Sequence, residues 1–226
     1  MKAFEELPAQ FQNAEVKRYY DLLKKKRVKL FFKRVLDILL SVIMLVFLII
    51  PIAVISIVVK AGSKGPVMFK QERVTTYGKT FKILKFRTMV ENAESLGSQV
   101  TTENDGRVTG AGRILRKYRL DELPQIFNVL SGSMSIVGVR PEVPKYVNRY
   151  RDEYYATLLR PAGITSPASI MYKDEDTLLA EGGDADTVYI DTILPEKMKY
   201  NLSYIEDFGL FSDIGLMVKT VVEVFK

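Results

Sequence analysis

The chain has 226 residues and a formal net charge of +6, and it contains neither cysteine nor histidine. These absences exclude a thiolate nucleophile, a histidine-based triad and the common zinc sites, so any catalysis must use carboxylates, hydroxyls, Lys, Arg or Tyr, with or without a hard metal ion. The positive charge predicts an anionic partner, either nucleic acid, a phosphorylated substrate or a membrane surface.

Residues 1–34 combine a basic cluster with interleaved apolar side chains. This pattern predicts an amphipathic segment on an anionic membrane surface, and the alternative is a solvated basic helix. The cations of the cluster are Lys24, Lys25, Lys26, Arg27, Lys29, Lys33 and Arg34.

Residues 38–59 carry no charge, and as a helix they would extend about 33 Å, enough for a bilayer core of about 30 Å. We therefore predict a membrane segment over residues 35–60. Both of its flanks are basic, whereas a spanning helix normally collects Lys and Arg on its cytoplasmic side. Pro51 removes a backbone hydrogen bond and can kink the helix. These features favour a re-entrant helix, and a single span with a proline kink is the alternative.

Residues 61–226 begin with a breaker-rich linker at residues 62–66, and the sequence after it has the character of a soluble domain. Within it, residues 67–74 and 80–87 predict two strands of a hairpin. Alternation in the second strand puts Lys85 and Arg87 on one face. The two cations fit either an anion-binding face or a charged, protective strand edge. The polar residues 91–112 that follow are interpreted as a mobile loop able to close over a substrate.

Asp121 and Glu122 are the residues on which we expect the chemistry to depend. Apolar residues recur at helical spacing after Pro124, so the acidic pair should lie at or just before a helix N-terminus. A carboxylate there is stabilised by the helix dipole, and a phosphate would find unpaired backbone N–H groups. Spacing alone fits an ordinary acidic helix cap as well.

Several arginines could bind an anion near this pair. Arg113 and Arg116 are three residues apart and share a helical face. Arg140 and Arg160 each precede a proline in a Gly-containing loop, which suits bidentate phosphate recognition, although surface arginines are the commoner explanation. The last segment, from Phe208 onward, has helical periodicity and predicts a core helix, with an interfacial helix as the alternative.

Four motifs occur along the chain in a recognisable order. They read VMFKQERV, FKILKFRTM, GRILRKYRLDELPQIFNVLSGSMSIVGVRP and LRPAGIT. Together they resemble the bacterial sugar transferases known as monotopic phosphoglycosyl transferases, over roughly residues 33–165 and more weakly to the C-terminus. The resemblance implies transfer of a phospho-sugar from a UDP-sugar to polyprenyl (undecaprenyl) phosphate, giving polyprenyl-diphosphate-sugar and UMP with Mg²⁺, as the start of surface glycan assembly.

The resemblance also implies roles for individual residues. Asp121 matches the family nucleophile, which forms a phospho-sugar aspartyl intermediate, and Glu122 matches the neighbouring acid. The pair would also hold the metal ion. The apolar segment would be a re-entrant helix broken at Ile50 and Pro51. The residues near the substrate phosphates would be Lys85, Arg116 and Arg140, with Arg87, Arg113 and Arg160 as weaker matches.

Three departures from the family pattern are visible. Ile50 stands where a Ser often precedes the proline, which removes a hydroxyl that could hold the kink. Val139 interrupts the Gly-Pro-Arg-Pro pattern and is expected to relax the loop carrying Arg140. The family pattern Arg-Pro-Gly-Ile-Thr-Gly-Trp reads RPAGITSP in the fourth motif and the residues after it, with an extra Ala162 and no Trp, which leaves the identity of the sugar open.

The expected fold is α+β: a mostly helical monotopic membrane protein with a re-entrant N-terminal helix, a small β-hairpin and amphipathic interfacial helices. Its regions would be a basic segment (1–34), a membrane helix (35–60) and a cytoplasmic catalytic domain (61–226) at the bacterial inner membrane. The expected partners are a UDP-sugar, polyprenyl phosphate and membrane lipids, with a homodimer left open. Nucleic acid is not expected, because it would leave the apolar run unexplained. The rival is a non-catalytic membrane-tethered module that binds polyprenyl phosphate or scaffolds other enzymes.

Overall fold

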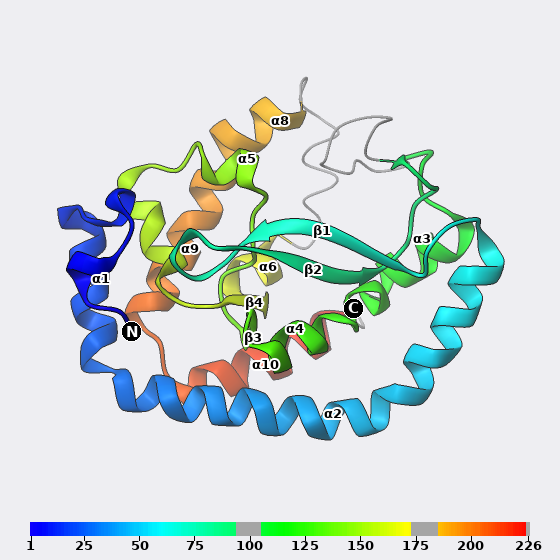
Figure 1. Cartoon of the computed structure of the whole chain (residues 1–226), viewed down its shortest axis with the longest axis horizontal. Coiled ribbons are helices and arrows are strands. Elements are labelled where there is room, and N and C mark those ends of the chain that lie inside the picture. Colours follow the sequence, from blue (N-terminus) through cyan, green and yellow to red (C-terminus); the bar gives the residue numbers. More distant parts are fainter. Residues whose placement is uncertain (94–104, 173–184, 225–226) are drawn as a thin grey trace.

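The computed structural model describes residues 1–93, 105–172 and 185–224, and confirms the α+β class with a mostly helical chain (Figure 1). The strands are β1 (Met68–Val74), β2 (Thr80–Phe86), β3 (Met134–Val137) and β4 (Ala162–Thr165). Short 3₁₀ helices at Leu120–Glu122 and Asp152–Leu159 and a π-helix at Tyr189–Ile193 complete the elements used below. The α-helices are α1 (Ala14–Lys25), α2 (Arg27–Gly62), α3 (Gly110–Lys117), α4 (Gln125–Ser131), α5 (Pro144–Val147), α6 (Pro167–Met171), α8 (Ala185–Val188), α9 (Leu194–Glu206) and α10 (Leu210–Val224).

Helix α2 contains the predicted membrane segment and continues through Pro51. It is the one helix in the described ranges that is long and apolar enough to cross a membrane. Phe47 is 74% exposed and Ile50 is 72% exposed, which is unusual for side chains of this size and fits a lipid-facing surface. Figure 1 shows α2 as a bent helix whose two ends both join the body of the protein on the same side. That shape is compatible with re-entry, which stays a prediction.

Buried charges attach α2 to the rest of the fold. Lys33 lies 2.8 Å from Asp213 of α10 and 3.4 Å from Asp37, and each of the three residues is at most 4% exposed. Ser135 of β3 donates a 2.7 Å hydrogen bond to Asp37, and Tyr204 of α9 donates a 2.8 Å bond to Asp213. We call Lys33, Asp37 and Asp213 the anchor cluster. It corrects the sequence interpretation of Lys33 as a cation facing the membrane surface.

The N-terminal segment also packs on protein rather than standing apart from it. Helix α1 is amphipathic, as predicted, but its buried side chains Val16 and Leu23 belong to the main hydrophobic core. That core also contains Phe11, and residues of Asp152–Leu159 and α9 form its other side. Arg34 of the basic cluster donates hydrogen bonds to two carbonyl groups at the end of α4.

The two small sheets hold the loops that matter for the site. Strands β1 and β2 form the predicted antiparallel hairpin, whereas β3 and β4 form a parallel pair that the sequence did not indicate. Beyond β3, Gly163 donates to the Val139 carbonyl and Gly138 donates to that of Thr165. A Cβ atom on Gly163 would lie only 2.2 Å from the backbone of Gly138, so the two loops touch directly. The loop carrying Arg140 is therefore firmly held, and the expectation that Val139 relaxes it is not supported.

Helix α10 forms where the sequence predicted a helix, but it is not a core helix. Phe211 is 91% exposed and Val218 is 59% exposed, so an apolar face remains uncovered by the rest of the chain. Figure 1 shows α10 running beside α2, and the Lys33–Asp213 ion pair joins the two helices. The interfacial alternative is thus favoured over the core prediction. Of the loop predicted over residues 91–112, residues 94–104 lie outside the described residues. Residues 110–112 form the first turn of α3, so the predicted loop extended too far.

Candidate active site

Asp121 and Glu122 lie just before α4, as the sequence predicted, in a short 3₁₀ turn that follows α3. Arg119 enters this turn in the left-handed conformation, with φ of 54°. Neither acid caps α4, because the residue before that helix is Pro124 and no side chain bonds its first N–H groups. The N–H groups of Glu122 and Leu123 already donate to carbonyls within the turn. The helix-cap interpretation is therefore wrong, and cations rather than these two N–H groups must neutralise a bound phosphate.

Glu122 is a buried carboxylate surrounded by cations. Its Oε1 accepts a 2.7 Å hydrogen bond from Arg140 and a 2.9 Å bond from Lys85, and Arg119 approaches to 4.0 Å. Burial by itself would raise the pKa of Glu122, but Arg140 and Lys85 outweigh it and hold the pKa well below its usual range. Glu122 is therefore ionised and fixed in place.

Asp121 is equally buried, with 7% of its surface exposed, but its surroundings differ. Its carboxylate makes no hydrogen bond or ion pair with any residue in the described ranges. Burial raises its pKa, Lys85 lowers it and the charge on Glu122 raises it. A buried carboxylate without a protein partner is available to a ligand.

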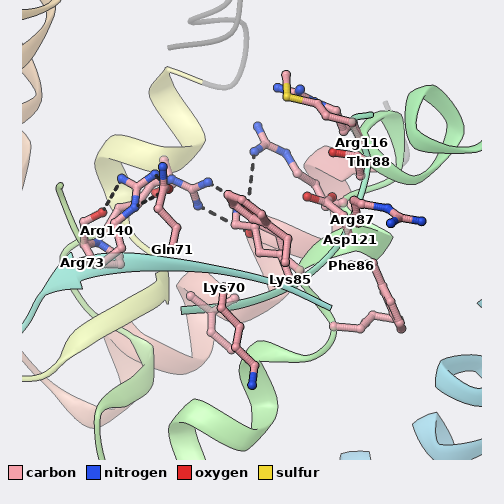
Figure 2. A pocket seen from close by; sticks show the side chains of 18 of the residues that line it. Lys70, Gln71, Arg73, Lys85, Phe86, Arg87, Thr88, Arg116, Asp121 and Arg140 are labelled. Atoms are coloured by element: carbon pink, nitrogen blue, oxygen red, sulfur yellow. Dashed lines mark hydrogen bonds and ion pairs between the residues drawn. The ribbon is translucent and has the colours of Figure 1, made fainter. Parts of the chain in front are cut away.

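Both acids line a cleft of about 1860 Å³. Figure 2 shows Lys85 and Arg140 on one side of Asp121 and Arg116 on another. Met44 and Leu48 of α2 also line the cleft, so the membrane helix forms part of its wall. The arrangement can hold a polyanion beside a carboxylate, next to an apolar surface.

The other three predicted cations have different positions. Arg87 lines the cleft but donates hydrogen bonds to the carbonyls of Ser63 and Lys64, at the end of α2. Arg160 is 8% exposed and lies over the Phe208 ring, 3.9 Å from its centre. Arg113 is exposed on α3. Among the described residues the cleft lining includes neither Arg113 nor Arg160, so the geometry gives no support to their predicted role.

The comparison with protein families agrees with this geometry. The model of the family described as "Bacterial sugar transferase" matches residues 28–226. The chain belongs to the bacterial sugar transferase family. The match covers α2, the hairpin, the acidic pair and both Arg-Pro loops, so every part of the cleft described above lies within the family region.

Three relatives illustrate the range of this family. The chain is 37% identical over 84% of its length to the UDP-N-acetylgalactosamine-undecaprenyl-phosphate N-acetylgalactosaminephosphotransferase of Aeromonas hydrophila, covering 43% of that protein. It is 36% identical over 88% of its length to the UDP-glucose:undecaprenyl-phosphate glucose-1-phosphate transferase of Klebsiella pneumoniae, covering 41%. A transferase of the latter name from Caulobacter vibrioides is 31% identical over 84% of this chain, and 68% of that protein is covered. The chain thus spans less than half the length of the first two relatives.

The sequence interpretation did not identify some of the polar residues that line the cleft. Arg73 lines the cleft, donates to the Pro141 carbonyl and forms hydrogen bonds with Gln71. Alternation along β1 and the hairpin register could have placed Gln71, Arg73 and Lys85 on one face. Glu142 also lines the cleft, together with Tyr189 and Lys197 from a distant segment, and no local signal marked these residues.

The acidic pair is the candidate metal site of the cleft. Within the described residues there is no group of three or more acidic side chains that could hold a metal ion. Mg²⁺, however, is commonly bound through one or two carboxylates together with substrate phosphates and water. Asp121, which has no partner among these residues, and the adjacent Glu122 fit that mode, provided that the substrate supplies the remaining ligands.

Proposed function

We propose that this protein is a phosphoglycosyl transferase that moves a phospho-sugar from a UDP-sugar to undecaprenyl phosphate and thereby starts surface glycan assembly. The printed activities of the relatives support this reaction class. The observation that carries the proposal is the Asp121 carboxylate: it is buried, lacks a partner in the described chain, and lines a cationic cleft beside the membrane helix.

In the first step an oxygen of Asp121 attacks the β-phosphorus of the UDP-sugar. A bond forms between that oxygen and phosphorus, the bond from phosphorus to the bridging oxygen breaks, and UMP leaves with the electron pair. In the second step an oxygen of undecaprenyl phosphate attacks the same phosphorus, releasing the Asp121 carboxylate and producing undecaprenyl-diphosphate-sugar. Such covalent catalysis fits a chain that has no Cys or His.

The cations supply the electrostatic part of the mechanism. Arg140 and Lys85 are held against Glu122, so their positions are fixed before a substrate arrives. Arg116 lowers the pKa of Asp121 and lines the cleft, which puts its charge near the attacking group. Preorganised cations of this kind stabilise charge that develops on the transferring phosphoryl group.

Asp121 and Glu122 would hold a Mg²⁺ ion in the proposed enzyme. When bound with the diphosphate, the ion neutralises charge on the phosphoryl oxygens and so favours attack by a carboxylate. The protein's own contribution is to keep Glu122 ionised through Arg140 and Lys85.

We further propose that α2 is re-entrant and that the catalytic domain lies on the cytoplasmic face of the bacterial inner membrane. The bend of α2 and its basic flanks support this topology, and Met44 and Leu48 would bring the lipid phosphate to the cleft. Cysteines introduced near the N-terminus and after Gly65 should both resist labelling from outside intact cells. Labelling of just one of them would establish a spanning helix instead.

The experiment that tests the reaction compares Asp121→Asn with the exposed control Asp152→Asn. With UDP-sugar and undecaprenyl phosphate, Asp121→Asn should reduce UMP release by about 10³-fold or more and abolish the phospho-sugar adduct seen by intact mass, because the attacking oxygen is lost. Asp152→Asn should behave as the wild type. Near-normal UMP release by Asp121→Asn would refute the nucleophile. Lipid binding without UMP release by the wild type, across a panel of UDP-sugars, would favour the non-catalytic rival.

A further inference from the structure

A second buried polar group lines the cleft beyond the acidic pair, and the reaction as proposed does not use it. The Tyr189 hydroxyl donates a 2.6 Å hydrogen bond to Oε1 of Glu142. Lys197 donates a 3.0 Å bond to the Tyr189 hydroxyl and lies 3.7 Å from the same Oε1. All three residues are at most 6% exposed and all three line the cleft. We call them the Glu142 network.

The two oxygens of Glu142 are in different situations. The contacts of the carboxylate with Tyr189 and Lys197 fall on Oε1, and Oε2 makes no hydrogen bond within the part of the chain that the structure describes. The buried side-chain atoms that are closed to solvent and lack a hydrogen-bond partner do not include Oε2. This oxygen therefore remains accessible from the cleft. Oε2 thus faces a cleft that is also lined by the cations Arg73 and Lys197.

The surroundings keep this carboxylate in one position. Its backbone carbonyl accepts a hydrogen bond from the N–H of Val74, and Arg73 holds the adjacent Pro141 carbonyl. The Tyr146 ring packs against that of Tyr189 with centres 4.6 Å apart, and Tyr189 begins the π-helix between α8 and α9. Such wide turns are frequent at functional sites. In Figure 1, α5 and α8 lie on the side of the molecule opposite α2.

The chemistry of Oε2 restricts what it can meet. A carboxylate repels phosphate and accepts hydrogen bonds from O–H or N–H groups, so it should face an uncharged, donor-bearing part of the ligand. Glu142 is two residues beyond Arg140, which contacts the acidic pair. In a sugar nucleotide the group attached directly to the reacting phosphorus is the sugar.

We infer that Oε2 of Glu142 accepts a hydrogen bond from a hydroxyl or acylamino group of the donor's sugar, and that the Glu142 network is a determinant of sugar specificity. This inference rests on the proposed function. The inference places the two substrates in the cleft: the lipid approaches along α2, and the sugar occupies the side formed by the Glu142 network.

The test measures equilibrium binding of UDP-glucose, UDP-N-acetylgalactosamine and UDP to the full-length protein with Asp121→Asn, in which the first step cannot occur. Adding Glu142→Gln should weaken binding of at least one UDP-sugar about tenfold or more, because a charge-assisted hydrogen bond is lost, and leave UDP binding within about twofold. Tyr189→Phe, which keeps the ring, should weaken binding of the same UDP-sugar by a smaller factor. Glu196→Gln, on the exposed side of α9, is the matched control and should change nothing.

Equal weakening of UDP and UDP-sugars by Glu142→Gln, or no change for any of them in either variant, would overturn the inference. In an Asp121-intact background, Glu142→Gln should also change the ratio of kcat/KM between sugar donors, which a purely structural role would leave unaltered. These results are separable from failure of the proposed function. If the wild type released no UMP from any donor, the reaction itself would be refuted, and the inference with it.

Discussion

The anchor cluster and the acidic pair both bury charge, but they do so in opposite ways. In the anchor cluster one lysine meets two carboxylates, and each carboxylate also accepts a hydrogen bond from a neutral hydroxyl. In the acidic pair, Glu122 takes the close cationic contacts while Asp121 keeps none within the described chain. Burying charges that contact one another fixes structure, whereas burying a carboxylate without a partner costs stability and leaves a reactive group. The contrast separates the residues that position α2 from the residue that reacts.

The largest expected effect comes from breaking the anchor cluster. Lys33→Ala leaves Asp37 and Asp213 buried without their cation and should destabilise the protein by about 3–5 kcal/mol. Thermal unfolding in detergent would measure the loss. Lys29→Ala, an exposed lysine on the same helix, should be close to wild type. Equal stability of the two variants would show that the anchor cluster does not hold α2.

Removing a cation from the acidic pair should affect turnover more than stability. Arg140→Ala takes away the closest partner of Glu122 and a fixed charge in the cleft, and should lower kcat about 10²-fold, as for loss of one preorganised electrostatic group. Arg113→Ala, exposed on α3, serves as the control and should retain activity. If instead Arg113→Ala were the more damaging change, the cleft would have been assigned wrongly.

The unpartnered state of Asp121 should appear in the pH dependence of the first step. Its pKa is raised, chiefly by burial, so UMP release should fall on the acid side at a pH above the ordinary Asp pKa of about 3.9. Lys85 lowers that pKa, so Lys85→Gln should move the acid limb of the pH profile, where UMP release falls, to higher pH. Lys82→Gln, exposed on β2, should leave the limb in place. A limb that moved to lower pH in Lys85→Gln would contradict the assignment.

The smallest expected effect is a change in melting temperature that has opposite signs for variants of the two acids. The raised pKa of Asp121 means that its ionised form weakens the fold at neutral pH, so Asp121→Asn should raise the melting temperature. The lowered pKa of Glu122 means that its ionised form contributes stability above the unfolded-state pKa, lost as pH falls through the folded-state value. Glu122→Gln should therefore lower the melting temperature. Changes on the order of 1 kcal/mol correspond to about 2–4 °C for a chain of this size, which calorimetry resolves. Shifts of the same sign in both variants would refute the contrast.

Local patterns predicted the parts of the site that are close in sequence. Alternation placed Lys85 on its strand, and Pro124 with the following apolar residues placed the acidic pair before α4. Helical spacing was too coarse for the arginines of α3, because residues three apart differ by about 60° around the axis, and Arg116 lines the cleft while Arg113 does not. The Glu142 network and the anchor cluster join segments distant in sequence, and no periodicity reports such a pairing.

The connection between Lys33 and Asp213 also has a consequence for how the protein is made. Lys33 lies near the beginning of α2 and Asp213 in the last helix, with most of the chain between them. Because α2 precedes α10 in the chain, Lys33 and Asp37 are synthesised before Asp213, and the buried contact between the two helices can form only after both have been made. We therefore expect the contact between α2 and α10 to be a late step of folding, although the two residues that form it lie near the beginnings of their helices.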